Sequence, residues 1–284
     1  MADLTSFWRG IELVHDVVYF APGAKERYEA LGLRGYWMGY FASRAGALGA
    51  EPTPAVVTAT FHGFAPAMVH RALPDAWALA DRVRVLEERV DIARDTLSAA
   101  LNGALDRSDI PDLAQRLVPV LAGLDLAGKP LAAAEASLPV PDDAVGALWR
   151  RATVLREFRG DCHVAVLVSE GLGGALANVL AVATGRAPEH QRRTRGWSEP
   201  EWAAARADLR QRGWTNDDGT ASISGRSTRD RLEDATDRAC QAAMTTASVV
   251  AAEDVTGVLQ AAAAAITATG VVPFPNPVGV ARPS

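Results

Sequence analysis

The most distinctive run of potentially reactive residues is Arg159-Gly160-Asp161-Cys162-His163. Gly160 allows the chain to turn, and Asp161 suits the N-cap of a following helix. His163 would then lie in the first helical turn, where the positive end of the helix dipole lowers an imidazole pKa. Because a general base must be neutral, His163 is a candidate for acid–base chemistry. The alternative is structural: Asp161 caps the helix, Arg159 forms an ion pair and His163 packs in the core.

A second candidate group lies in the predicted helix Thr5–Phe20. Glu12, His15 and Tyr19 are three and four residues apart, which places them close to one helix face. In a catalytic arrangement His15 would act as an acid or base, and Tyr19 would donate a hydrogen bond. The apolar stripe of the same helix continues past His15, so a buried core histidine is the alternative.

Aromatic residues gather in the next part of the chain. All four tyrosines lie within the first 40 residues, and a predicted helix over 36–48 presents one aromatic face. If this face meets His163, it forms an apolar, aromatic-walled pocket with two imidazoles, an arginine and a carboxylate. The residues predicted to bind a substrate there are Trp37, Tyr40, Phe41, Arg44 and Arg159, and those predicted to act on it are His15, Tyr19, Asp161 and His163. The alternative is that the aromatic residues form core alone.

No residue pattern predicts a metal site or a particular cofactor. His62, His70 and His190 lack the spacing of zinc motifs, and Cys162 and Cys240 are not in a C-x-x-C pair. The glycines at 171, 173 and 174 do not follow a strand, which argues against a dinucleotide site. The cofactor, if any, stays unknown.

The composition is that of an ordinary soluble protein. The chain has 284 residues, of which 49% are hydrophobic and 22% charged, with a net charge of −5. Because we find no apolar run near 18 residues and no leader peptide, we expect a cytoplasmic protein without a membrane span. The strong preference for arginine over lysine indicates a high-GC genome, so bacterial specialised metabolism is a plausible setting.

Helical periodicity runs through residues 1–158 and predicts an all-helical N-terminal domain. In residues 159–284, a helix, a glycine turn and a second helix indicate a helix-turn-helix outline. Ser198 caps a further helix, Glu199–Arg212, and an Asp-Gly turn before Thr220–Ser224 predicts two paired strands. The fold class is therefore mainly α: an N-terminal multi-helix domain packed on a winged-helix-like C-terminal module, with a short two-stranded wing and an extended tail.

Two resemblances support this organisation. In the first, a segment of the C-terminal half resembles the reading helix, wing and following helix of MarR-like winged-helix domains. The residues that carry this resemblance are Gly196-Trp197-Ser198, Glu201-Trp202, Leu209, Arg212-Gly213-Trp214, Asp218-Gly219, Gly225-Arg226, Glu233 and Asp237-Arg238. The chain as a whole is similar to a family of helical actinobacterial proteins, through residues 19–22, 31–44, 64–66, 159–165 and 276–277. The resemblance implies a shared fold and transfers no activity.

The charge of the predicted reading helix argues against DNA binding. Its first turn carries Glu199 and Glu201, and the wing adds Asp217 and Asp218, all of which a phosphate backbone repels. An arginine-rich rim over residues 192–195 would be screened within about 8 Å. We therefore expect the module to serve packing or dimerisation, with DNA binding kept as an alternative.

Three functional hypotheses follow. The first is a small-molecule-binding protein, an enzyme that acts on a hydrophobic or aromatic metabolite by His/Asp acid–base chemistry between the two domains. The second is a ligand-responsive, MarR-like transcriptional regulator. The third is an interaction protein that dimerises through its winged helix. In each case we expect a homodimer.

Overall fold

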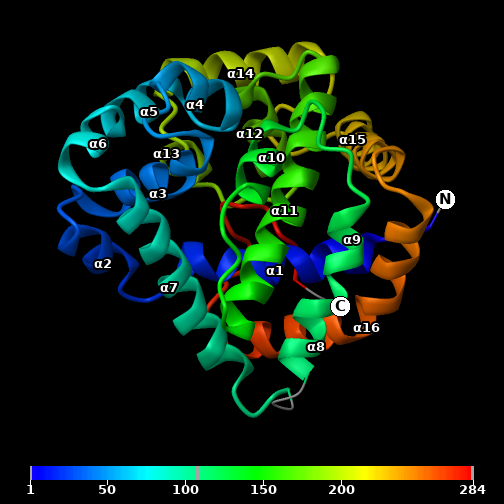
Figure 1. Cartoon of the computed structure of the whole chain (residues 1–284). Helices are drawn as coiled ribbons and strands as arrows, with labels where there is room; N and C mark the ends of the chain where they lie inside the picture. Colours follow the sequence, from blue (N-terminus) through cyan, green and yellow to red (C-terminus); the bar gives the residue numbers. More distant parts are fainter. Residues whose placement is uncertain (1, 106–108, 283–284) are drawn as a thin grey trace.

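The computed structural model describes residues 2–105 and 109–282, and helices account for its regular structure (Figure 1). The helices are α1 Thr5–Phe20, α2 Ala24–Ala30, α3 Gly35–Ala45, the 3-10 helix η1 Gly46–Leu48, α4 Pro54–Thr60, α5 Pro66–Ala72, α6 Asp75–Leu79, α7 Arg82–Leu101, α8 Asp109–Arg116, α9 Val118–Ala122, α10 Pro130–Ala136, α11 Ala144–Ser169, α12 Gly174–Ala183, α13 Gln191–Thr194, α14 Glu199–Gln211, α15 Ile223–Ala242 and α16 Thr246–Thr269.

The mainly α class is confirmed, but the two-stranded wing is wrong. Where the wing was expected, Thr215 and Ala221 form one isolated antiparallel bridge, and no strand pair develops in the described residues. The tight turn is present, since the amide of Asn216 donates to the carbonyl oxygen of Thr220 over 2.8 Å. The reason is length: the Ser222 side chain already caps α15, so the returning segment becomes helix before a second strand can form.

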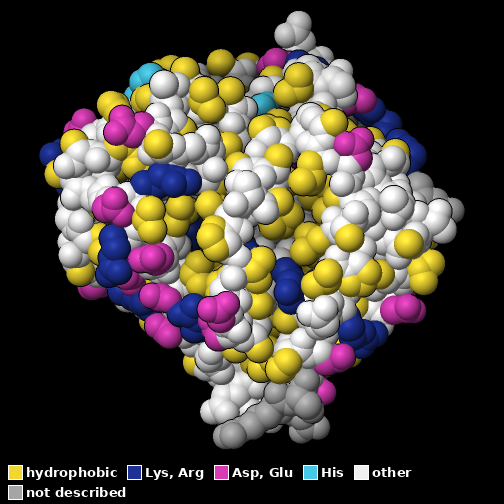
Figure 2. All heavy atoms as spheres, viewed as in Figure 1, with side chains coloured by type: hydrophobic (Ala, Val, Ile, Leu, Met, Phe, Trp, Pro, Cys, Tyr) yellow, Lys and Arg dark blue, Asp and Glu magenta, His cyan; other side chains and the backbone are white. Residues whose placement is uncertain are grey.

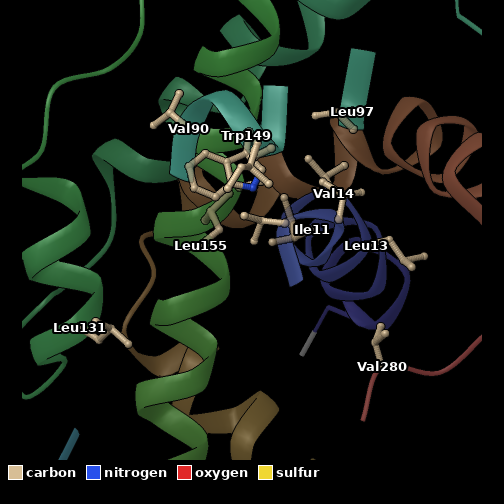
Figure 3. Close-up of a cluster of buried hydrophobic side chains, with 14 of the residues drawn as sticks. Ile11, Leu13, Val14, Val90, Leu97, Leu131, Trp149, Leu155 and Val280 are labelled. Carbon is tan, nitrogen blue, oxygen red and sulfur yellow. The ribbon is translucent and has the colours of Figure 1, made fainter. Parts of the chain in front are cut away.

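The first and last long helices pack together in the centre of the molecule. α1 crosses the view of Figure 1 horizontally, with α11 and α16 against it. A Cβ atom on Gly10 would lie 3.1 Å from the Leu259 Cβ, so the glycine permits this close approach. Figure 3 shows Ile11 and Val14 of α1 near Trp149 of α11, and Val280 of the C-terminal tail belongs to the same buried cluster. One large apolar core therefore joins elements from both ends of the chain.

α11 is longer than the sequence analysis expected. The predicted break at Gly160 is wrong, because one helix runs without interruption from Ala144 to Ser169. Asp161 caps a different helix: its Oδ2 accepts hydrogen bonds from the amides of Leu131 and Ala132, each 2.9 Å away, at the start of α10. The expected domain boundary at 158/159 therefore falls inside α11.

A second, smaller apolar cluster organises the C-terminal module. The end of α11 packs with α12, α14 and α15, and Trp202, Ala205 and Leu209 form the inward stripe of α14 as predicted. Ser198 and Glu201 form the complete capping box that starts α14. The module is thus a helical bundle with α12 and α14 in contact.

Among the described residues, α16 is long and apolar enough to cross a membrane by length and composition alone, although no such segment was expected from the sequence. One of its faces is buried, mainly against α1, while Glu253 and Asp254 are exposed. A helix with this division of faces is typical of a protein core. α11 and α12 pass the same test only as a pair, and they are bent by 101°.

The Asp161 cap gives a first prediction. Asp161→Ala removes the acceptor of two buried backbone amides, so we expect it to lower the free energy of unfolding by about 1–3 kcal/mol. Urea unfolding followed by circular dichroism measures this change. Asp230→Ala, at an exposed position on α15, is the matched control and should have an effect below about 0.5 kcal/mol. Equal stability of the two variants would contradict the capping role.

Candidate functional site

A cavity of about 410 Å³ lies between the N-terminal helices and the C-terminal module. Both parts of the chain contribute to its wall: α1, α3, the end of α4 and the loop after it, α10, α11, α12, α13, α15 and the C-terminal tail. The lining is mostly polar, and it includes seven arginines and six carboxylates. These residues are Arg9, Arg44, Arg156, Arg159, Arg186, Arg195, Arg229, Glu12, Glu157, Asp161, Glu233, Asp234 and Asp237.

The loop after α4 connects the two parts at the cavity. A Cβ atom on Gly174 would lie 2.1 Å from the carbonyl oxygen of His62, so only glycine lets α12 approach this loop. The Gly63 carbonyl accepts hydrogen bonds from Asn178 Nδ2 (2.9 Å) and Trp197 Nε1 (3.2 Å). Asn178 Oδ1 in turn accepts from Gln191 Nε2 over 2.8 Å. The cavity wall is therefore rigidly bonded to the helix-turn-helix module.

A buried ionic cluster forms the inner end of the cavity. Glu157 accepts hydrogen bonds from Arg44 Nη2 (2.7 Å) and Arg156 Nη1 (2.8 Å), and its side chain is 2% exposed. Burial alone would raise the pKa of Glu157, but the two guanidinium groups hold it well below its usual range. Glu157 is therefore ionised at all physiological pH values.

His15 belongs to the protein core beside this cluster and does not line the cavity. Its Nδ1 and the Thr153 hydroxyl are 2.9 Å apart, and its Nε2 and the Tyr19 hydroxyl 2.8 Å apart. Because the single Thr153 proton goes to the Trp149 carbonyl, His15 must donate from Nδ1 and accept at Nε2. Burial lowers the pKa of His15 well below its usual value, in agreement with a neutral ring. This is the arrangement of the core-histidine alternative.

The predicted aromatic face packs on itself instead of lining the cavity. Trp37, Tyr40 and Phe41 contact one another and Phe64 at ring-centroid distances between 5.0 and 6.4 Å. Of the residues predicted on this helix, Arg44 alone is in the cavity lining. The expected aromatic wall is therefore mostly core, and the cavity is polar.

The outer end of the cavity holds Arg159 and His163. Arg159 Nη2 donates to Glu233 (2.9 Å) and Asp237 (3.1 Å) of α15. His163 Nδ1 is 2.9 Å from the Thr236 hydroxyl, whose proton goes to the Leu232 carbonyl, so Nδ1 carries the imidazole proton. Burial lowers the pKa of His163 to about 4.

The structure thus brings Arg44, Arg159, Asp161 and His163 to one cavity, and leaves His15, Tyr19, Trp37, Tyr40 and Phe41 behind its wall. Asp161 does not orient His163, because the two side chains leave α11 in different directions and contact different helices. The described residues contain no group of three or more His, Cys, Asp or Glu side chains that could hold a metal ion.

Sequence reasoning missed Arg156, Glu157 and Arg195 as cavity residues. Glu157 lies between apolar positions of a predicted helix, next to Phe158. A carboxylate placed on the buried face of a helix is the signal that could have identified it, since such a charge requires a buried partner.

These features define an all-helical protein whose helix-turn-helix module closes on an N-terminal helical half across a polar cavity. A model of a helix-turn-helix family matches residues 4–273, and the chain therefore belongs to this helix-turn-helix family. The match covers both halves of the structure. No curated protein and no solved structure gives a significant match.

Asp16 gives a pH-dependent prediction. This residue of α1 is fully buried, neither carboxylate oxygen has a hydrogen-bond partner, and burial raises its pKa from 3.8 to about 8. Because the folded pKa exceeds the unfolded one, the contribution of Asp16 to stability is complete below pH of about 4 and is lost as the pH rises toward 8.

We expect Asp16→Asn to abolish this loss of stability. The free energy of unfolding of the variant should therefore rise relative to that of the wild type between pH 5 and pH 8, by at most about 1.4 kcal/mol per pH unit. Thermal unfolding at several pH values measures it, with the exposed Asp230→Asn as control. An advantage that stays constant with pH would contradict the raised pKa of Asp16.

Proposed function

We propose that this protein is a ligand-responsive helix-turn-helix regulator, in which a small molecule in the cavity controls how the C-terminal module engages DNA. The observation that carries the proposal is that residues of both the N-terminal half and the C-terminal module line the cavity. Gln191 and Arg195 reach it from the segment that leads into α14, while Arg44 and Phe61 reach it from the N-terminal half. An occupant would therefore contact both parts of the molecule at once.

The contacts around Gly63 support a coupling of cavity and module. The amide of Ala65 donates to the carbonyl oxygen of Arg195 over 2.9 Å, one residue before the glycine turn that starts the approach to α14. A change in the loop after α4 would therefore be transmitted to the start of α14 through hydrogen bonds. A ligand that binds two arrangements of this loop with different affinity would then shift the population of conformations of the module.

The acidic first turn of α14 should repel DNA phosphates less than its sequence indicates. Glu199 is 3.0 Å from Arg192, and Glu201 is bound in the capping box, so both carboxylates have partners within the module. Farther along α14, Arg206 is exposed between small residues, Ala203 and Ala207. This face offers a cation that can approach a phosphate closely.

Charge is otherwise mixed over the surface. Figure 2 shows acidic and basic side chains next to one another over α2 and α7, the region where Arg27 pairs with Glu88 and Asp95. On the side shown, the charges over α2 and α7 are therefore mixed, and we propose that the module makes the DNA contact because the family is a helix-turn-helix family. We do not extend the proposal to catalysis, because Asp161 and His163 have separate structural partners.

The test is binding of the protein to the DNA upstream of its own gene, measured by fluorescence anisotropy at ~150 mM salt. We expect Arg206→Glu to weaken binding to this DNA at least about tenfold, because it places a negative charge against the phosphates. The control is Arg84→Glu on α7, an equal change of charge at an exposed position in the other half of the chain.

Two results would overturn the proposal. One is a wild-type protein that binds this DNA no better than an unrelated sequence at that salt concentration. The other is an equal loss of binding in both variants, which would mean that overall charge, and not the face of α14, determines the affinity.

A further inference from the structure

The inner end of the cavity carries more positive than negative charge. Arg44, Arg156 and Arg195 all line it, and Glu157 is the single carboxylate that Arg44 and Arg156 share. Three guanidinium groups therefore face one ionised carboxylate. Buried charge is costly unless it is paired, so an excess of this kind calls for an additional anion.

Arg195 is the least compensated of the three. Its Cζ lies 4.4 Å from the centroid of the Phe64 ring, Nη2 donates to the Pro277 carbonyl, and Nε is buried without a partner. Its side chain also hydrogen-bonds Tyr40, which already accepts from Arg44. All of its described partners are neutral groups. Burial and the neighbouring charges of Arg44 and Arg156 lower the pKa of Arg195.

The other carboxyl groups near this end do not supply the missing charge. Asp16 is fully buried with a pKa raised to about 8, and it is therefore mostly protonated near neutral pH. Asp161 has its Oδ2 bound to the amides of α10, and no ion pair joins it to the three arginines in the described residues. Glu233 and Asp237 are bound to Arg159 at the outer end.

The remainder of the cavity is suited to polar groups. Beyond the three arginines, the wall presents the carboxylates of Glu12, Glu233 and Asp237 and the imidazole of His163. Glu233 and Asp237 are already bound to Arg159, but each carboxylate keeps lone pairs that can accept hydrogen bonds from the hydroxyl groups of a ligand, and a purely aromatic molecule has no such groups to offer.

We propose that the ligand of this cavity is a small hydroxylated organic anion, whose carboxylate or phosphate group is held by Arg44, Arg156 and Arg195. This inference rests on the proposed function, because it names the class of molecule to which the regulator responds. Arginine presents a planar fork of donors that matches both kinds of anion. It replaces the hydrophobic or aromatic ligand expected from the sequence.

The experiment is isothermal titration calorimetry of the full chain with glycerol 3-phosphate, gluconate and glycerol, at constant ionic strength. The first two probes carry a phosphate and a carboxylate, and glycerol is the matched neutral compound. We expect at least one of the anions to bind and glycerol not to bind. Which anion binds distinguishes the two kinds of charged group.

Two variants locate the binding. Arg195→Gln and Arg156→Gln each remove one cation of the cluster, and we expect each to weaken anion binding about tenfold to a hundredfold. In the described part of the C-terminal tail, up to residue 282, no hydrogen bond to Arg156 is present, so the Arg156 variant separates anion binding from tail attachment. The matched control is Arg193→Gln, an exposed arginine on α13 outside the cavity lining, which should bind as the wild type does.

The outcomes separate this inference from the proposed function. Equal binding of glycerol and the anions, or full anion binding in both cluster variants, would overturn the assignment. The assignment would also be overturned if neither anion bound the wild-type protein. In that case, a neutral molecule found bound in the native mass spectrum would still be compatible with the regulator proposal. If anion binding requires the three arginines but the protein does not bind its upstream DNA, the result would support the proposed ligand class and contradict the proposal that the protein is a regulator.

Discussion

The arrangement of this protein depends on keeping charge paired inside a helical core. Glu157 of α11 is bonded to Arg44 of α3, and its carboxylate is 3.9 Å from His15 of α1, so three helices meet at one ionised group. Glu135 of α10 is held in the same way by Arg89 and Arg150. Loss of one partner would leave a buried ion uncompensated, which is why such clusters fix the relative positions of helices.

Local signals in the sequence predicted local structure well. Helix α1 has the predicted bounds, and the cap at Ser198 and the inward stripe of α14 follow from residue types within a few positions. Such features are determined by neighbours along the chain, where propensity, capping and periodicity act. The mainly α class followed from the same signals. The predicted two-stranded wing was wrong, because the chain forms one isolated bridge and then enters α15.

The site was harder to predict, because its partners are far apart in the sequence. Arg44 looked like part of an aromatic face, but its carboxylate partner lies 113 residues away. Asp161 looked like the cap of its own helix and instead caps α10, 30 residues earlier. The abundance of arginine indicated only a high-GC genome, yet Arg44, Arg89 and Arg150 are buried. Only the tertiary arrangement reveals these pairings.

The contact of α1 with α16 has a consequence for how the chain folds. At about 5–20 residues synthesised per second, α1 waits tens of seconds on the ribosome before the helix that covers it has emerged. During this interval α7 and α11 can already pack on α1, but the side that α16 covers has no partner. Contacts between distant parts of a sequence also slow folding, because loop closure precedes the gain from packing. The side of α1 that α16 covers therefore stays without its native partner until α16 itself has been synthesised.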